Sequence, residues 1–375
     1  MMRSPFKLEL LPPDPIFGIE EAFRNDDRPG KISLVVGSYR DEEGKPWPLP
    51  SVMEAEKRVQ GQSEEYLPIE GDPRFIDGIK KLFGRDLVVF QAIGGAGALT
   101  LGGELAKRGI EGATIHLPHP TWANHTPLFK RVGLKIETYP YPEFDQMVER
   151  IEGLGEKDLV LLHLVCHNPT GIDPTDEEWK RLSQAFAKGG AIPFFDLAYL
   201  GFGAGVKEDL EPLKNFSSAG IPFLLAFSCS KSFGLYGERV GALCVSSNSG
   251  KQEILSQGKQ WIRSCYSNSP LFGASVVAKI LSDKELYKAW ENDVKQMKHR
   301  LQAGRRLFLE RLQTHLPNVE KGRGMFSLLP LKLTDVRRLR DEFALYLPDS
   351  GRISFASVTP KNVDFIVNIL RPLLS

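Results

Sequence analysis

Short apolar runs alternate with amphipathic stretches through the middle of the chain, from about Val88 to Val245. Brief apolar runs bounded by glycine or polar residues are typical of buried strands, and apolar positions three or four residues apart are typical of helices. Their alternation predicts an α/β fold, in which crossover helices join the strands of a mostly parallel central sheet. The predicted strands are Val88–Phe90, Thr114–Leu117, Leu159–Leu162, Ile192–Phe195, Phe223–Phe227 and Gly241–Val245.

Two helices have clear beginnings in the sequence. Thr175 and Glu178 have the spacing of a capping box, in which each side chain bonds the backbone N–H of the other residue, and a glycine pair ends that helix. Ser282 and Glu285 have the same spacing and precede a long apolar pattern that reaches Leu312. A helix of that length is expected to leave a large domain and enter a smaller one.

The long helix divides the chain into two expected units. We expect residues 46–296 to form the large domain, and residues 1–45 and 297–375 to form a smaller α+β domain with an amino-terminal arm. The length of 375 residues agrees with two domains. Prolines keep the arm extended, so we expect it to pack on the small domain or on a neighbouring subunit; they are Pro5, Pro12, Pro13 and Pro15.

Composition narrows the class of partner. The 48 basic and 47 acidic side chains leave a net charge of +1, so no overall field draws the chain to nucleic acid or to a membrane surface. No apolar run is as long as a membrane span and the first residues lack an apolar signal core, which predicts a cytoplasmic protein. The four cysteines have no CxxC spacing, so we expect neither a disulfide framework nor a metal site. Chemistry on small molecules is favoured.

Lys231 has unusual neighbours: Ser228 and Ser230 precede it, Ser232 follows it, and Arg239 comes shortly after. An amine in such a place can form a Schiff base with an aldehyde cofactor, while the hydroxyls and the guanidinium hold that cofactor's phosphate. The alternative is an ordinary solvated lysine. The choice depends on residues elsewhere in the chain.

Polar residues follow several predicted strands, at the sheet edge where functional groups gather in α/β proteins. Gly94–Gly97 could present free backbone N–H groups to a phosphate, or could form only a tight packing turn. Trp122 could stack on a flat cofactor ring or belong to the core. Asn168 lies in a turn, which could present its amide or serve the turn alone. Asp196 ends a strand, where it could pair with a protonated ring nitrogen or cap a helix, and Tyr199 follows one turn later.

In order and along nearly the whole chain, these motifs closely resemble those of the class I aminotransferases of pyridoxal-phosphate fold type I, in the branch of aspartate and aromatic aminotransferases. The matching motifs are Val36-Gly37-Ser38-Tyr39-Arg40, Tyr66-Leu67, Gly94-Gly95, Trp122-Ala123-Asn124-His125, His167-Asn168-Pro169-Thr170-Gly171, Asp196-Leu197-Ala198-Tyr199, Ser228-Cys229-Ser230-Lys231, Tyr266-Ser267-Asn268 and Gly351-Arg352. The resemblance implies pyridoxal 5'-phosphate (PLP) as cofactor.

The resemblance also implies roles for the matching residues. Lys231 would hold PLP as a Schiff base and then move a proton during catalysis. Asp196 would pair with the ring nitrogen, with His125 supporting it from behind, and Tyr199 would bond the ring oxygen and take part in catalysis. The other implied cofactor contacts are Gly95, Ala96, Trp122, Asn168, Ser228, Ser230, Arg239 and, from the other subunit, Tyr66.

Two arginines carry the substrate choice that the resemblance implies, because a guanidinium holds a carboxylate by two parallel hydrogen bonds. Arg352 would bind the α-carboxylate, and Arg263 would reach across a homodimer to the side-chain carboxylate of aspartate or glutamate. Gly37 and Phe326 match the lid and the small-domain wall that close on the substrate. Trp122 and Asn168, already named as cofactor contacts, would also touch the substrate.

Three departures from the family pattern are visible. Ala96 stands where the branch has a hydroxyl residue on the phosphate, so one hydrogen bond worth about 1–3 kcal/mol is expected to be missing. Ser269 replaces the first proline of an Asn-Pro-Pro turn, which is expected to loosen the loop behind Arg263. The segment between Phe326 and Gly351 is short, which affects the substrate-closing wall more than the chemistry.

The leading prediction is therefore an aminotransferase that converts L-aspartate and 2-oxoglutarate into oxaloacetate and L-glutamate by a ping-pong cycle. An aromatic aminotransferase with broad specificity would use the same residues. A nucleotide-dependent oxidoreductase could use Gly94–Gly97 as its phosphate turn, but the third glycine spacing is missing. An inactive scaffold with this fold is a further alternative, although no catalytic position is lost.

Overall fold

The computed structural model describes residues 8–35, 37–61 and 65–374. Pro5 of the expected arm and Val36 of the first motif lie outside these residues. Within them, no helix has both the length and the apolar character needed to cross a membrane.

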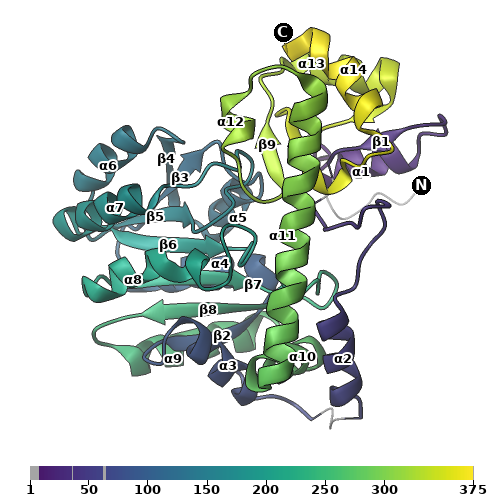
Figure 1. Cartoon of the computed structure of the whole chain (residues 1–375). Helices are drawn as coiled ribbons and strands as arrows, with labels where there is room; N and C mark the ends of the chain where they lie inside the picture. The colour runs from purple at the N-terminus through teal and green to yellow at the C-terminus, as the bar shows by residue number, and fades with distance from the viewer. Residues whose placement is uncertain (1–7, 36, 62–64, 375) are drawn as a thin grey trace, which may run out of the picture.

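A seven-stranded sheet forms the centre of the larger part of the molecule (Figure 1). Every adjacent pair of strands is parallel except the two pairs that contain β8, which runs in the opposite direction. This confirms the predicted α/β fold with a mostly parallel sheet. In spatial order the strands are β2 (Val88–Ile93), β8 (Val240–Ser246), β7 (Phe223–Ser228), β6 (Ile192–Leu197), β5 (Asp158–His163), β3 (Thr114–His119) and β4 (Lys135–Pro140).

Helices cover both faces of this sheet, because successive strand residues point to opposite faces and both sets are apolar. Phe194, for example, packs in one core and Phe195 in the other. The first core includes helices α4 (Gly94–Gly109), α5 (His125–Val132) and α9 (Lys251–Cys265). The second core includes α2 (Pro50–Val59), α3 (Pro73–Phe83), α6 (Phe144–Glu152), α7 (Asp176–Gly189), α8 (Glu211–Ser218) and α10 (Phe272–Ser282), with the short η1 (Glu208–Leu210) beside it.

The two ends of the chain build a smaller part together. Strand β1 (Ile32–Ser33) pairs in parallel with β10 (Leu345–Tyr346), and β9 (Phe326–Leu328) pairs antiparallel with β11 (Arg352–Ser354). A separate apolar core lies here and joins Leu34 to residues from Phe308 onward. The remaining elements are α1 (Phe17–Arg24), α12 (Pro317–Glu320), α13 (Leu333–Phe343), η2 (Phe355–Ser357) and α14 (Val363–Leu374).

The long helix α11 (Lys284–Leu312) runs along both parts, as Figure 1 shows. Trp290 belongs to the core under the large sheet, and Phe308 belongs to the smaller core. The predicted capping box at Ser282 is wrong. Asp283 caps the helix instead, by accepting from the backbone N–H groups of Glu285 and Leu286 at 3.1 and 3.2 Å. Ser282 still belongs to α10, where its hydroxyl donates to the carbonyl of Ala278.

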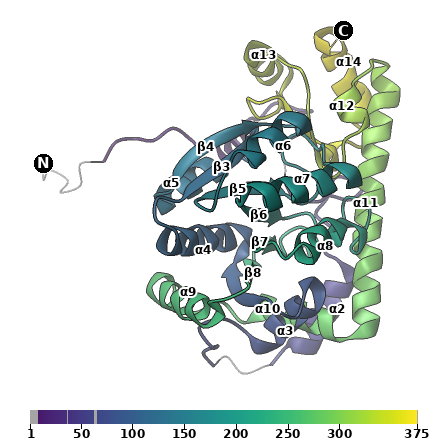
Figure 2. The same cartoon turned by 90° about the vertical axis from the view of Figure 1, so that its left-hand side faces the viewer.

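The capping box of α7 is confirmed, with Thr175 and Glu178 bonded to each other's backbone. The segment before α1 is extended and runs away from the rest of the chain in Figure 2. Leu8, Leu10 and Leu11 are each at least 77% exposed, so this part of the arm does not pack on the small domain of its own chain. The exact domain bounds of 46–296, and of 1–45 with 297–375, stay a prediction.

Candidate active site

Three strand ends meet at one edge of the large sheet and form a cradle. Strand β2 ends at Ile93, and Gly94 begins helix α4 directly after it. Strand β7 ends at Ser228. Because β8 runs in the opposite direction, its beginning lies at this same edge, and Arg239 comes just before it. Because the reversed strand β8 lies between β2 and β7, Arg239 is placed between the C-terminal ends of those two strands.

Side chains close this cradle tightly. Arg239 Nη1 donates to Ser230 Oγ at 3.3 Å and to the carbonyl of Tyr236 at 2.9 Å. A Cβ built at Gly94, whose φ is +74°, would overlap Arg239 Nη2, and one built at Gly95 would lie 3.0 Å from Ser228 Cβ. Only glycine therefore lets the backbone pass here.

The cradle fits a phosphate. The first backbone N–H groups of a helix have no partner within the helix and attract anions, and those of α4 belong to Gly94, Gly95 and Ala96. Two serine hydroxyls and a guanidinium complete the donors. Ala96 offers only its backbone, in agreement with the missing hydroxyl noted in the sequence.

Lys231 follows the cradle and is half-buried. Its amine lies 5.7 Å from the centre of the Tyr199 ring, which is buried. Burial lowers the pKa of Lys231 to about 8; the carboxylate of Asp196 raises it, and the cations Arg239 and Arg352 lower it further. Near neutral pH about a tenth of this amine is therefore neutral and nucleophilic, far more than for a lysine with its ordinary pKa.

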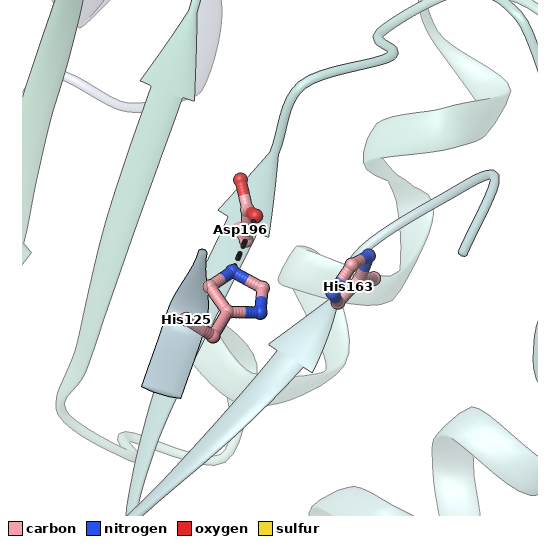
Figure 3. A group of neighbouring side chains, drawn as sticks. All are labelled: His125, His163 and Asp196. Atoms are coloured by element: carbon pink, nitrogen blue, oxygen red, sulfur yellow. Dashed lines mark hydrogen bonds and ion pairs between the residues drawn. The ribbon is translucent and has the colours of Figure 1, made fainter. Parts of the chain in front are cut away.

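Asp196 is buried at the end of β6 and bonds a buried histidine (Figure 3). His125 Nε2 lies 3.1 Å from Asp196 Oδ2. Burial opposes ionisation of Asp196, but the hydrogen bond from His125 and the positive charge of Lys231 favour the carboxylate, and the pKa of this carboxyl is lowered. Asp196 is therefore a carboxylate held in a buried place.

A chain of hydrogen bonds continues behind His125. Thr121 Oγ1 lies 2.8 Å from His125 Nδ1 and 3.4 Å from His163 Nε2. The backbone N–H of Asn168 donates to His163 Nδ1 at 3.2 Å. Burial lowers the pKa of His163 to about 3, so this ring is neutral.

The backbone donor fixes the tautomer of His163. Because His163 Nδ1 accepts, its proton lies on Nε2 and is donated to Thr121. In the neutral form of His125, the Thr121 hydroxyl donates to His125 Nδ1 and the His125 proton lies on Nε2, facing Asp196. His125, His163 and Asp196 have the composition of a metal site, but these hydrogen bonds engage all four ring nitrogens.

Arg352 enters the site from the smaller part of the molecule, at the beginning of β11. It is buried; Nη1 donates to Asn168 Oδ1 at 3.1 Å and Nη2 to the Val35 carbonyl at 2.7 Å. Its Nε is buried without a partner, and burial lowers its pKa to about 10. The guanidinium lies 4.0 Å from the centre of the Phe326 ring. Such a group has spare donor capacity for an anion.

The remaining predicted residues lie around this centre or outside it. Gly37 faces Phe326, whose ring atom Cζ lies 3.9 Å from a Cβ built at Gly37. The Trp122 ring is half-buried and lies edge-on to His125, with 5.2 Å between ring centres. Tyr66 is 88% exposed, and Arg263 is exposed with its guanidinium donating to Ser267 Oγ. Among the described residues, no hydrogen bond or ion pair joins either of these last two side chains to the cradle residues.

Sequence reasoning missed two members of the site, Thr121 and His163. His163 directly follows the predicted strand Leu159–Leu162, and Thr121 directly precedes Trp122. Both stand just after strands at the functional edge of the sheet, which is the signal that could have found them.

The fold and this site define an enzyme of the PLP-binding transferase type, and known proteins agree. A family model for aminotransferase class I and II matches residues 29–370. The chain is 39% identical, over an alignment of 392 residues, to the aspartate aminotransferase of Pseudomonas aeruginosa, with 98% of each chain covered. It is 40% identical over 365 residues to the tyrosine aminotransferase of Rhizobium meliloti, with 92% of this chain and 94% of that one covered.

A solved structure extends the likeness to three dimensions. It is an aromatic-amino-acid aminotransferase from Burkholderia pseudomallei covalently bound to pyridoxal phosphate, with a TM-score of 0.95, 36% identity and 100% of both chains covered. The chain belongs to the class I and II aminotransferase family. This confirms the predicted family and counts against a nucleotide-dependent oxidoreductase.

Proposed function

We propose that this aminotransferase uses PLP to move the amino group of L-aspartate to 2-oxoglutarate in two half-reactions. The observation that carries the proposal is the convergence of the phosphate cradle, the amine of Lys231 and the buried carboxylate Asp196 at one sheet edge. Relatives named aspartate aminotransferase support the choice of donor.

When bound, PLP supplies an aldehyde that reacts with amines and a ring that draws electrons from the substrate's Cα. The proposed holding groups are the cradle for the phosphate, Trp122 for one ring face, and Asn168 with Tyr199 for the ring oxygen. Asp196 presents its negative charge to the ring nitrogen. The hydrogen-bond chain through His125 keeps that carboxylate oriented and ionised.

Lys231 has two tasks in this proposal. Its amine holds the cofactor covalently between turnovers, and after release it accepts the proton from the substrate's Cα. A pKa near 8 suits both tasks, because the amine can be neutral to attack and can still carry a proton at physiological pH.

Arg352 would bind the α-carboxylate of the incoming amino acid. Its bond to Asn168 and its place against Phe326 fix the plane of the guanidinium before the substrate arrives. The second carboxylate of aspartate needs another cation, and Arg263 from the partner subunit of a homodimer would supply it.

A symmetric homodimer with two composite sites is part of the proposal. Tyr66 and Arg263 are exposed in the single chain, and the exposed leucines of the arm offer apolar surface for a second copy. Sedimentation should give a dimer; an active monomer would contradict this part. The cytoplasmic location remains a prediction.

Two measurements test the chemistry. Borohydride treatment of the yellow protein should fix the cofactor to Lys231, as a mass increase on the peptide that contains it, and K231A should show none. R263A should lower kcat/KM for aspartate by about two orders of magnitude and leave that for phenylalanine within a few-fold, because only aspartate loses a charged partner.

The second candidate is an aromatic aminotransferase of broad specificity. It is favoured by the tyrosine aminotransferase of Rhizobium meliloti, whose identity to this chain is 40%. The same comparison of donors separates the two, since a higher kcat/KM for phenylalanine and tyrosine than for aspartate would defeat the aspartate proposal.

A further inference from the structure

Gln91 joins the two segments that we propose to act in the partner's site. It lies on β2, the edge strand of the large sheet, and is fully buried. Tyr66 belongs to the first segment, residues 66–72, and Arg263 belongs to the second, residues 263–270. Both segments run past the outer edge of β2, where a strand has unpaired backbone groups to offer.

Each segment makes two hydrogen bonds with Gln91, one as donor and one as acceptor. On the side of residues 66–72, its side-chain Oε1 accepts from the Asp72 N–H at 2.9 Å, and its backbone N–H donates to the Glu70 carbonyl at 2.8 Å. On the other side, its side-chain Nε2 donates to the Pro270 carbonyl at 2.7 Å, and its backbone carbonyl accepts from Ser269 Oγ at 3.0 Å. All four polar groups of this residue are thus engaged by the two segments.

The two segments are also bonded to each other. Asn268 Nδ2 donates to the Leu67 carbonyl at 3.0 Å, next to Tyr66. Arg263 in turn donates to Ser267, next to Asn268. A continuous path of bonds and backbone therefore leads from the phenol to the guanidinium.

The packing at Gln91 leaves little freedom. Gly71 has a φ of +121°, and a Cβ there would overlap Gln91 Cβ, so the first segment passes directly over this side chain. Asp72 is buried and is held in turn by Arg74 at 2.8 Å and Ser275 at 3.3 Å. The hydrogen bond from Ser269 to Gln91 could not be made by the proline of the common family turn, because proline has no hydroxyl group. The loosening predicted for this loop is thus opposed by a new hydrogen bond.

We propose that Gln91 is a positioning residue that sets Tyr66 and Arg263 together for the partner's active site. Binding of a substrate's side-chain carboxylate and of the cofactor's phosphate in one subunit then depends on Gln91 of the other. This inference rests on the composite sites of the proposed function.

The first test uses the homodimer of Q91M, which keeps the volume and loses both side-chain hydrogen bonds. KM for aspartate should rise about tenfold, and kcat should stay within about twofold. The reason is that loss of the hydrogen bonds that position Arg263 should weaken binding of the side-chain carboxylate by about this factor. kcat/KM for phenylalanine should stay within about threefold. The Kd of the cofactor-free protein for PLP should rise several-fold. An unchanged KM for aspartate and an unchanged Kd for PLP would overturn the inference.

A matched control separates positioning from stability. Val89 lies on the same strand, is buried and belongs to the apolar core. V89A should lower the thermal midpoint at least as much as Q91M does and leave KM for aspartate unchanged. If V89A raises that KM equally, Gln91 has only a structural role and the inference fails. S269A, which removes one bond and leaves the Gln91 side chain in place, serves in every assay if Q91M does not fold.

The second test asks in which subunit Gln91 acts. A mixed dimer of Q91M with K231A has one working lysine, on the Q91M chain, and that site takes its partner segments from the intact K231A chain. Its KM for aspartate should equal that of wild type. A wild-type chain paired with the double variant Q91M/K231A should instead show the raised KM. The reverse pattern, or no difference between the two dimers, would overturn the inference.

R263A in place of Q91M shows which proposal has failed. If wild type paired with R263A/K231A does not show a raised KM for aspartate, the composite site of the proposed function is wrong, and the inference fails with it. If R263A acts across the dimer and Q91M does not, only the inference about Gln91 is wrong.

Discussion

The amine of Lys231 lies between opposing electrostatic influences, and these set the pH at which it can react. Burial is the largest and lowers its pKa to about 8, Asp196 raises that pKa, and Arg239 and Arg352 lower it. Below the pKa the amine is protonated and cannot attack an aldehyde; above it the amine is free. Uptake of PLP by the cofactor-free protein should therefore speed up with pH and level off above about 8, not near the ordinary value of a lysine.

The same balance predicts opposite shifts for two variants. D196N removes a negative charge and should lower the pKa of Lys231 further, whereas R352M removes a positive charge and should raise it. The measurement is an NMR titration of ¹³C-methylated lysines in the cofactor-free protein, with the Lys231 signal assigned by its loss in K231R. A wild-type value close to 10, or shifts of the same sign in both variants, would contradict this account.

Ala96 allows a gain of function to be predicted. Its N–H lies in the first turn of α4, but its methyl group cannot donate a hydrogen bond. A96S should restore one hydrogen bond to the phosphate and tighten PLP binding about fivefold, which corresponds to about 1 kcal/mol. Fluorescence titration of the cofactor-free protein gives the Kd. Pyridoxal without its phosphate is the control and should bind equally to both proteins; a tighter Kd for pyridoxal would mean that the hydroxyl acts elsewhere.

At the scale of elements, the beginning of α11 depends on one carboxylate. Asp283 accepts from two backbone N–H groups there and also meets Arg58 and Lys279. D283A should lower the free energy of unfolding by about 1 kcal/mol, the usual worth of a cap, as a lower urea midpoint. S282A should cost much less, although the sequence pattern favours Ser282. D283N keeps the cap and loses the charge; if it were as unstable as D283A, the ion pairs and not the cap would matter.

The sequence pattern located the elements well and their edges less well. The six predicted strands are all present because each carries a continuous apolar run buried on both faces of the sheet. Strand β4 escaped prediction because Lys135–Pro140 is mixed in polarity and largely exposed, so it lacks the continuous apolar run of the other strands of the large sheet. The cap of α11 shifted by one residue because serine and aspartate stand side by side and both can cap.

The site, too, was predicted only in part from the sequence. Motifs with fixed order identified Lys231, Asp196 and Arg352, and the structure brings these three to one place. The hydrogen-bond chain behind Asp196 could not be predicted, because Thr121 follows β3, whereas His163 ends β5 and Asn168 lies in the segment after it. Only the fold shows that they lie in one line.

At the scale of the whole molecule, the site is divided between two parts that share helix α11. Asp196 belongs to the large sheet and Lys231 to the turn after its strand β7, whereas Arg352 comes from β11 beside the second core. The bond from Arg352 to Asn168 already spans the two parts. Halfway along α11, Arg300 donates to the carbonyls of Asp41 and Val358, which ties the helix to both ends of the chain.

This division predicts that a diacid closes the molecule. One carboxylate would bind Arg352 and the other would bind Arg263 of the partner subunit, so a single ligand pulls the smaller part of one chain toward the large part of the dimer. Gly37 and Phe326 lie against each other beside Arg352 and would move with it. A monocarboxylate of similar size engages only one arginine and has no such effect, because a ligand shifts an equilibrium only by its differential affinity for the two states.

X-ray scattering of the PLP-loaded dimer measures this closure. A saturating, unreactive four-carbon dicarboxylate should reduce the radius of gyration of the wild-type dimer, and the monocarboxylate should not change it. Neither ligand should change the radius of gyration of R263A by much. Binding of the dicarboxylate measured by calorimetry, with an unchanged radius of gyration in the wild-type dimer, would show that the two parts are already closed and that the arginines recognise the substrate without moving.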